Sequence, residues 1–207
     1  MFLHKTPLVL KWIYPQLTWS KPTKEKVLYL TFDDGPIPDL TEFIIATLNS
    51  FNAKGTFFCV GDNIRKHKEI AERAIEAGHS LGNHTYNHMC GWKTELDTYI
   101  NNVNSCQQEL EDLGVKNTLM RPPYGQISRK QISELKDRFD ITMWDVLSGD
   151  FSSKITPEVC LNKSIKATRN GSIVLFHDNI KAEKNMKYAL PRYLEHFSKL
   201  GYAFKTL

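Results

Sequence analysis

The 207-residue sequence is poor in cysteine, and the few cysteines that it has are widely spaced. They are Cys59, Cys90, Cys106 and Cys160, and no two of them form a CxxC pair. This spacing excludes a zinc ribbon and a thioredoxin-like motif, and so few thiols do not make a disulfide scaffold. We therefore expect reduced cysteines that pack as small hydrophobic side chains.

Runs of one charge sign are also missing. The chain has 27 Lys and Arg against 23 Asp and Glu, which gives a net charge of +4. The densest basic stretch, residues 21–26, holds three Lys and one Glu, which is too little for a nucleic-acid-binding tail. We predict a mildly basic surface and no nucleic-acid partner.

No stretch approaches the roughly 20 apolar residues that a membrane-spanning helix needs. The apolar residues of segment 1–14 are interrupted by His4, Lys5 and Lys11. The segment has no uninterrupted apolar region and no small-residue cleavage site, so we expect no secretory signal and a cytoplasmic protein. Residues 1–14 either pack their aromatic side chains on the domain or make peripheral contact with a membrane surface, and the sequence leaves both open.

The sequence does contain a regular alternation of strand-like and helix-like segments. Hydrophobic residues make up 41% and charged residues 24% of the chain, as in ordinary globular proteins. Apolar periodicity predicts strands at residues 27–32, 55–60, 80–81, 118–120, 141–146, 172–176 and 202–204. It predicts helices at residues 40–51, 69–77, 94–113, 128–139, 157–168 and 184–199. The pattern indicates an α/β fold with parallel strands, and about seven β/α units favour a barrel over a doubly wound sheet.

We find no linker, repeat or low-complexity tract in the chain. We therefore predict a single domain over residues 23–207, with residues 1–22 as a short N-terminal extension packed on the barrel.

Polar residues follow several of these strands, where parallel sheets gather their chemistry. Asp33 and Asp34 come directly after the strand at 27–32, and two anions so close are costly without a cation nearby. His84 and His88 are four residues apart, so a helical turn would bring both imidazoles to one side. With one carboxylate they would form a metal site that leaves coordination positions open, whereas His79 is expected to be structural.

Two further strand ends carry titratable or orienting groups. Arg121 precedes two prolines that stiffen its loop, and it either pairs with a carboxylate or lies on the surface. His177 ends the strand at 172–176 and is a candidate general acid.

Taken together, these segments resemble the polysaccharide deacetylase family, the NodB-homology group or carbohydrate esterase family 4. The similarity rests on four motifs in the family's order, Thr31 to Pro36, His84 to His88, Arg121 to Tyr124, and Leu175 to His177. It covers roughly residues 27–180. The resemblance implies a distorted (β/α) barrel and metal-dependent hydrolysis of N- or O-acetyl groups on sugars.

The resemblance also implies a role for each motif residue. Asp34, His84 and His88 would hold a divalent metal, most often zinc in this family, with cobalt, nickel or manganese as alternatives. Asp33 would be the general base and His177 the general acid. Arg121 would orient Asp33, and the backbone N–H of Tyr124 would help bind the oxyanion. Leu175 would line the pocket for the acetyl methyl group.

One motif departs from the family pattern, in which an Asp that tunes the acid His is followed by Trp. Here Asp150 is followed by Phe151, and Asp145 is a weaker candidate for the same role. We predict that Asp150 tunes His177 and that Phe151 and Trp144 contact substrate. The change affects the expected glycan preference more than the chemistry.

The sequence thus predicts a hydrolase of carbon–nitrogen bonds in linear amides, acting on an acetylated carbohydrate or a small amide. Two alternatives stay open, an amidohydrolase acting on a non-sugar amide or cyclic imide, and a non-catalytic carbohydrate-binding relative. We expect a monomer or weak oligomer.

Overall fold

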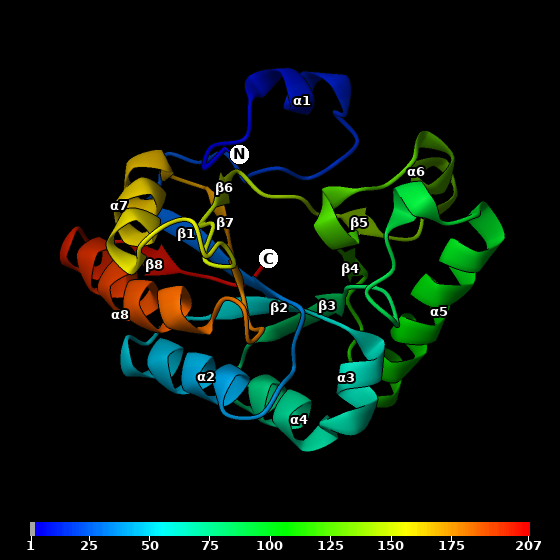
Figure 1. The fold of residues 1–207 in the computed structure, drawn as a ribbon, viewed down its shortest axis with the longest axis horizontal. Helices are drawn as coiled ribbons and strands as arrows, with labels where there is room; N and C mark the ends of the chain where they lie inside the picture. Colours follow the sequence, from blue (N-terminus) through cyan, green and yellow to red (C-terminus); the bar gives the residue numbers. More distant parts are fainter. Residues whose placement is uncertain (1–2) are drawn as a thin grey trace.

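The computed structural model describes residues 3–207, and Figure 1 shows a curled sheet surrounded by helices. The strands are β1 (Val27–Asp33), β2 (Gly55–Cys59), β3 (Ser80–Asn83), β4 (Leu119–Met120), β5 (Asp140–Ile141), β6 (Val146–Leu147), β7 (Ile173–His177) and β8 (Ala203–Phe204). The α-helices are α1 (Leu8–Ile13), α2 (Leu40–Ser50), α3 (Gly61–Lys66), α4 (Lys68–Glu76), α5 (Leu96–Asp112), α6 (Arg129–Leu135), α7 (Pro157–Ala167) and α8 (Glu183–Lys199). Two 3₁₀ turns, η1 (Gly91–Lys93) and η2 (Pro123–Gly125), complete the set.

The sheet is parallel, with the order β5-β4-β3-β2-β1-β7-β6, and β8 pairs with the start of β1 outside this order. Crossover helices flank the curled sheet, so the predicted distorted α/β barrel is confirmed. The central strand β1 lies between β2 and β7, and its register places Asp33 beside Phe58 on one side and His177 on the other. This register brings the polar residues at the carboxyl ends of separate strands to one mouth.

The predicted strand at 141–146 is instead two short strands on opposite sides of a gap. β5 pairs with β4, β6 pairs with β7, and residues 142–145 between them form no parallel ladder. The carbonyl oxygens of Thr142 and Met143 accept hydrogen bonds from the buried Arg121 side chain, at 3.1 and 2.8 Å. The backbone segment that would otherwise close the barrel therefore fixes the side chain of Arg121.

The N-terminal segment covers this gap. Isolated bridges join Lys5 to Val146, Thr18 to Thr142, and Ser20 to Ser172. Leu17 and Trp19 are buried in the hydrophobic cluster that also contains Ile141 and Met143. The expected N-terminal extension packed on the barrel is thus present.

Most predicted helices are observed, with ends that shift by a few residues. Gly114, with φ of 78°, follows α5, as expected for a residue that ends a helix. The short helices α1 and α3 were not predicted. The apolar residues of α1 do not face a core, because none of its residues is buried. α3 begins at Gly61, where a Cβ would lie 2.6 Å from the Tyr86 ring, so close packing determines this position.

The main hydrophobic core lies between the sheet and its helices, with a second cluster beneath α5, α6 and the N-terminal segment. All four cysteines are free thiols, and Cys59, Cys106 and Cys160 are buried. Over residues 3–207, no helix has the length and apolar character needed to cross a bilayer.

Candidate active site

The carboxyl ends of the strands surround a cavity of about 770 Å³, within the usual range for small-molecule sites. Nine of the residues singled out from the sequence line it, namely Asp33, Asp34, His84, His88, Tyr124, Trp144, Phe151, Leu175 and His177. Arg121 and Asp150 lie behind this lining and are fully buried. The cavity therefore brings together groups from five separate segments of the chain.

Asp34, His84 and His88 form a compact group whose potential ligand atoms all lie within 4.8 Å of one another. Asp34 Oδ1 is 3.0 Å from His88 Nε2 and 3.5 Å from His84 Nε2. The other ring nitrogen of His84, Nδ1, donates to the carbonyl oxygen of Arg121 at 2.7 Å, which turns Nε2 toward the centre. One carboxylate and two imidazoles oriented in this way fit a divalent metal such as zinc.

The two imidazoles converge through a loop and not through a helical turn. Thr85 and His88 have φ values of 61° and 55°, so the chain turns sharply after β3. The carboxamide of Asn102, on α5, accepts hydrogen bonds from the backbone N–H groups of Tyr86 and Asn87 and holds this turn. The ring centroids of His84 and His88 lie 5.1 Å apart as a result.

Asp33 is almost fully buried and is held by Arg121. The guanidinium donates from Nη1 to Asp33 Oδ1 at 2.7 Å and to Thr31 Oγ1 at 2.8 Å. Arg121 has no exposed surface, so it is not the surface residue that the sequence had left as an alternative. Asp33 Oδ2 faces the group of possible metal ligands described above and lies 3.8 Å from His84 Nε2.

His177 is paired with Asp150. Its Nδ1 donates to Asp150 Oδ1 at 2.8 Å, and its backbone N–H donates to Asp150 Oδ2 at 2.7 Å. Burial acts to lower the pKa of His177, but the charge and hydrogen bond of Asp150 outweigh it and raise the pKa to about 9. The alternative candidate, Asp145, contacts Lys5, Lys11 and Ser172 instead.

Aromatic side chains line the cavity beside these polar groups. The Tyr124 ring is 62% exposed and packs edge-on against His88, with ring centroids 4.7 Å apart. Phe151 packs in the same way against His177, at 5.2 Å. Trp144 and Leu175 also line the cavity, so all the residues expected to contact substrate face the same space.

Two site residues were missed from the sequence, Asn179 and Asp178. The amide of Asn179 donates a hydrogen bond to Asp34 Oδ2, beside the two histidines. Burial alone would raise the pKa of Asp34, but hydrogen bonds from His84 and His88 more than reverse this and hold it well below its usual range. Both residues come directly after His177 in the sequence, and this position at the end of a strand could have marked them as site candidates.

Asp178 lies under the turn that carries Asp34. It accepts hydrogen bonds from Gly35 N–H at 2.9 Å and from Thr41 Oγ1 at 2.7 Å. A Cβ at residue 35 would lie 1.8 Å from Asp178 Oδ2, so only glycine fits there. Burial raises the pKa of Asp178 to about 7. This buried carboxyl group positions the turn between Asp34 and α2.

The protein is a parallel α/β barrel with paired carboxylates and imidazoles at its mouth, an arrangement suited to metal-dependent hydrolysis. The chain belongs to the polysaccharide deacetylase family, because residues 20–142 match the model of the family described as polysaccharide deacetylase. That match spans well over half of the chain and includes three of the four motifs.

Individual relatives support this assignment. A peptidoglycan-N-acetylglucosamine deacetylase of Bacillus cereus is 29% identical over 92% of this chain and 91% of its own length. A second protein of that name from the same organism is 34% identical, over 77% of this chain and 58% of its own length. The crystal structure of the Bc1960 peptidoglycan N-acetylglucosamine deacetylase superposes with a TM-score of 0.89 and 30% identity, covering 98% of this chain and 95% of the other.

Proposed function

We propose that this protein is a metal-dependent hydrolase that removes acetyl groups from N-acetylated sugars of peptidoglycan or its fragments. The observation that carries this proposal is the convergence of Asp33, the Asp34–His84–His88 group and His177 in one cavity. The substrate class comes from the relatives, whose names specify peptidoglycan N-acetylglucosamine. We also propose that residues 23–207 form the single deacetylase domain.

Asp34, His84 and His88 would hold the metal, and zinc suits one carboxylate with two imidazoles. A bound divalent cation lowers the pKa of its water and polarises a carbonyl oxygen. Asn179 supports this site, because its amide hydrogen bond fixes the second carboxylate oxygen of Asp34.

Asp33 is the proposed general base. Its free Oδ2 faces the cavity, while Oδ1 is bound by Arg121. The carboxylate takes one proton from the attacking water as the water oxygen bonds to the acetyl carbon. Arg121 acts by fixing the orientation of Asp33, since its guanidinium is wholly buried and does not line the cavity.

His177 is the proposed general acid. Asp150 binds its Nδ1 and leaves Nε2 to face the substrate, and the raised pKa keeps the imidazole protonated at neutral pH. As the C–N bond breaks, His177 gives its proton to the leaving nitrogen. Water and the amide thus become acetate and a free amino group, with one proton passing to Asp33 and one leaving His177.

The rest of the lining positions the substrate. The backbone N–H of Tyr124 is the proposed donor to the developing oxyanion, and Leu175 is the proposed contact for the acetyl methyl group. Phe151 and Trp144 offer apolar faces to the sugar rings.

Acetate release from N-acetylglucosamine oligomers tests this function. We expect wild-type turnover that chelator abolishes and that falls by at least about 10²-fold in Asp33→Asn, which keeps the shape of the base but removes its charge. Full activity in both the chelated enzyme and Asp33→Asn would refute the mechanism. No acetate from any sugar would favour a non-sugar amide as substrate or a non-catalytic carbohydrate-binding role.

Metal analysis tests the ligand set separately. We expect one tight divalent ion per chain in the wild type and its loss in His88→Ala, because the cluster then keeps only two ligands. His196→Ala is the matched control, since His196 is exposed on α8, outside the cavity. A full equivalent of metal retained in His88→Ala would place the ion elsewhere.

A further inference from the structure

A second cavity, separate from the active site, is lined by cationic side chains. It has a volume of about 450 Å³ and lies between the N-terminal segment and the C-terminal half of α7. Its lining consists of His4, Lys5, Lys163, Lys166, Ala167, Thr168 and Arg169, without any carboxylate. Three lysines and one arginine among these residues make the cavity electropositive. Burial lowers the pKa of His4, the hydrogen bond with the Leu147 carbonyl oxygen opposes this, and the charge of Lys163 adds to the lowering.

Five of the 27 Lys and Arg residues of the chain lie at or beside this cavity. Lys5, Lys163, Lys166 and Arg169 line the cavity, and Lys11 joins them through the shared partner Asp145. Without these five cations and Asp145, the chain keeps 22 Lys and Arg against 22 Asp and Glu. These five cations and one carboxylate together carry a charge equal to the net charge of the chain.

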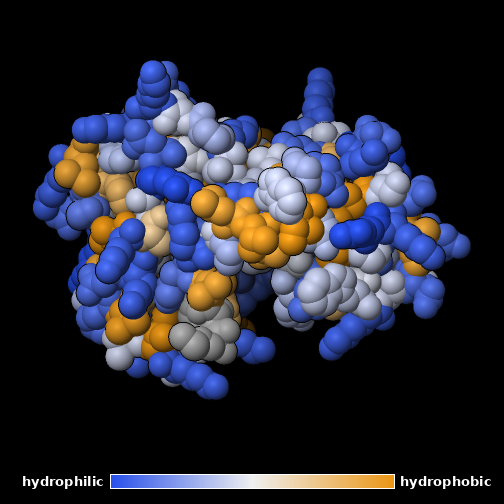
Figure 2. Space-filling view, turned by 90° about the horizontal axis from the view of Figure 1, so that it is seen from above, coloured by the Kyte–Doolittle hydropathy of each residue, from blue (hydrophilic) through white to orange (hydrophobic). Residues whose placement is uncertain are grey.

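The helix α1 next to this cavity exposes apolar side chains. Of the twelve large hydrophobic residues exposed among residues 3–207, six lie between Leu3 and Ile13. Leu8 is 72% exposed and Trp12 is 82% exposed, and no residue of α1 is buried. Figure 2 looks onto this face and shows an apolar patch at its centre, bordered by strongly hydrophilic side chains.

This apolar patch is fixed in place by the chain on both sides of it. Before α1, Lys5 binds Asp145 at 2.5 Å and Thr6 donates to the carbonyl oxygen of Trp144 at 2.7 Å. Lys11 on α1 also binds Asp145, at 2.5 Å, and Leu17 beyond the helix is buried in the second core cluster. Folding therefore holds Leu8 and Trp12 outward, which costs hydration free energy unless something covers them.

We propose that this face docks on an anionic lipid bilayer, with α1 in the interface and phosphate headgroups at the cationic cavity. Apolar insertion and attraction to anionic lipid are the two signals that together give stable peripheral binding, and Trp favours the interface. A second copy of the chain suits the face less well, because a two-fold contact would bring two cationic cavities together. A soluble phosphate would use the cavity but leave α1 uncovered.

Sedimentation with phospholipid vesicles tests the proposal on the full chain. We expect the wild type to bind vesicles of phosphatidylcholine with one third phosphatidylglycerol much better than phosphatidylcholine alone, and to be released by salt. Lys163→Gln with Lys166→Gln should weaken binding on the order of 30-fold, because two exposed cations are lost. Leu8→Ser with Trp12→Ser should weaken it at least as much.

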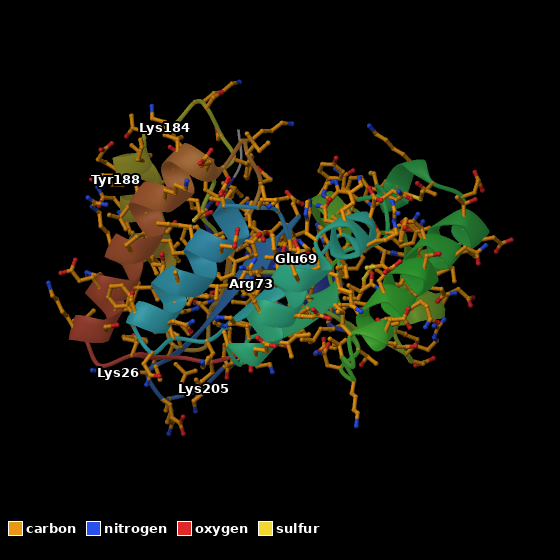
Figure 3. All side chains as sticks on the ribbon, turned by 90° about the horizontal axis from the view of Figure 1, so that it is seen from below. Lys26, Glu69, Arg73, Lys184, Tyr188 and Lys205 are labelled. Carbon is orange, nitrogen blue, oxygen red and sulfur yellow. The ribbon has the colours of Figure 1, made fainter. Side chains whose placement is uncertain are left out.

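The matched control is Lys184→Gln with Lys205→Gln, two exposed lysines that are seen from the side opposite α1 (Figure 3). This pair removes the same charge and should bind like the wild type. Equal melting temperatures would show that each variant is folded. Binding equal to wild type in either α1 or α7 variant, equal loss in the control, or no preference for anionic vesicles would overturn the proposal. Retention by the α1 variant would assign the cavity to a soluble anion instead.

Discussion

Asp145 and Asp150 are fully buried carboxylates on either side of the short strand β6, and their partners differ. Asp150 faces one imidazole, His177, in the active-site cavity. Asp145 is bound by two lysines of the N-terminal segment and by Ser172. One carboxylate therefore adjusts a titratable group that can react, whereas the other is fully neutralised by groups that stay charged.

The active-site cavity and the cavity beside α7 differ in a similar way. The active-site cavity contains carboxylates and imidazoles, which bind metals and transfer protons near neutral pH. The cavity beside α7 has one imidazole, His4, and is otherwise lined mainly by ammonium and guanidinium groups, which bind anions and stay charged near neutral pH. The chemical type of the lining groups therefore distinguishes the cavity of the proposed active site from the cavity of the proposed docking face.

Exchanging each carboxylate for its amide gives the largest expected contrast. Asp150→Asn should reduce deacetylation by about 10²-fold, because His177 loses the anion that orients and charges it. Asp145→Asn should stay within about threefold of wild-type activity, since its partners lie outside the active site. Steady-state kinetics on soluble oligomers measure both, and equal losses would contradict the assignment of Asp150.

The pH dependence of activity should also distinguish Asp150 from Asp145. As the proposed general acid, His177 would have to be protonated, and its pKa is raised to about 9, so activity should persist through neutral pH and fall as the pH rises through that value. In Asp150→Asn the same fall should occur at lower pH, whereas Asp145→Asn should keep the wild-type profile.

Removing the cations around Asp145 should affect stability more than chemistry. Lys5→Met with Lys11→Met leaves the buried carboxylate of Asp145 with Arg169, at 3.6 Å, as its remaining cationic partner. The double variant should lower the free energy of unfolding by about 1–3 kcal/mol, a range that allows for the partial exposure of both lysines. The folded state lowers the pKa of Asp145, so this contribution is present above the ordinary Asp pKa of about 3.9 and is lost as the pH falls below it.

Urea unfolding at about pH 7 and at about pH 3 measures this difference. The difference in free energy of unfolding between the wild type and the double variant should be larger at the higher pH and smaller at the lower one, because the contribution is lost only as the pH falls through the lowered pKa of Asp145. A constant difference at both values would show that the lysines act through packing alone.

The smallest effect is expected from Phe151→Trp, which restores the residue usual in the family. Phe151 packs edge-on against His177 and lines the cavity, so a larger ring extends the wall without removing a polar group. We expect KM for longer oligomers to change by about threefold or less, with kcat nearly unchanged. A large loss of kcat would show that the ring size at this position sets the orientation of His177.

The strand-end motifs could be recognised from the sequence because each one is local. Asp33 and Asp34 follow an apolar run, and His84 and His88 are four residues apart, so the residue types and spacings are visible without the fold. The periodicity also indicated alternating strands and helices, because apolar side chains must repeat to face a core. The convergence of His84 and His88 through a loop was not visible, because it depends on positive φ angles held by Asn102.

The partners of the buried charges depend on contacts between distant segments. Asp145 and Asp150 are both acidic residues near one short strand, and nothing local distinguishes them. The split of the predicted strand at 141–146 follows from Arg121, whose guanidinium binds backbone carbonyls there. The roles of Asp178 and Gly35 likewise arise only when β7 lies beside β1.

Short motifs and periodic apolar positions were enough to indicate the family, the alternation that builds the barrel and the residue types available for catalysis. Which carboxylate accepts a hydrogen bond from His177, and which one is bound by Lys5 and Lys11, depends on contacts formed in the folded chain. The fold also brings Lys163, Lys166 and Arg169 of the α7 region together with Lys5, near an exposed apolar helix. The physical reason is that electrostatic interactions depend on distance and burial, and both are set by segments far apart in the chain.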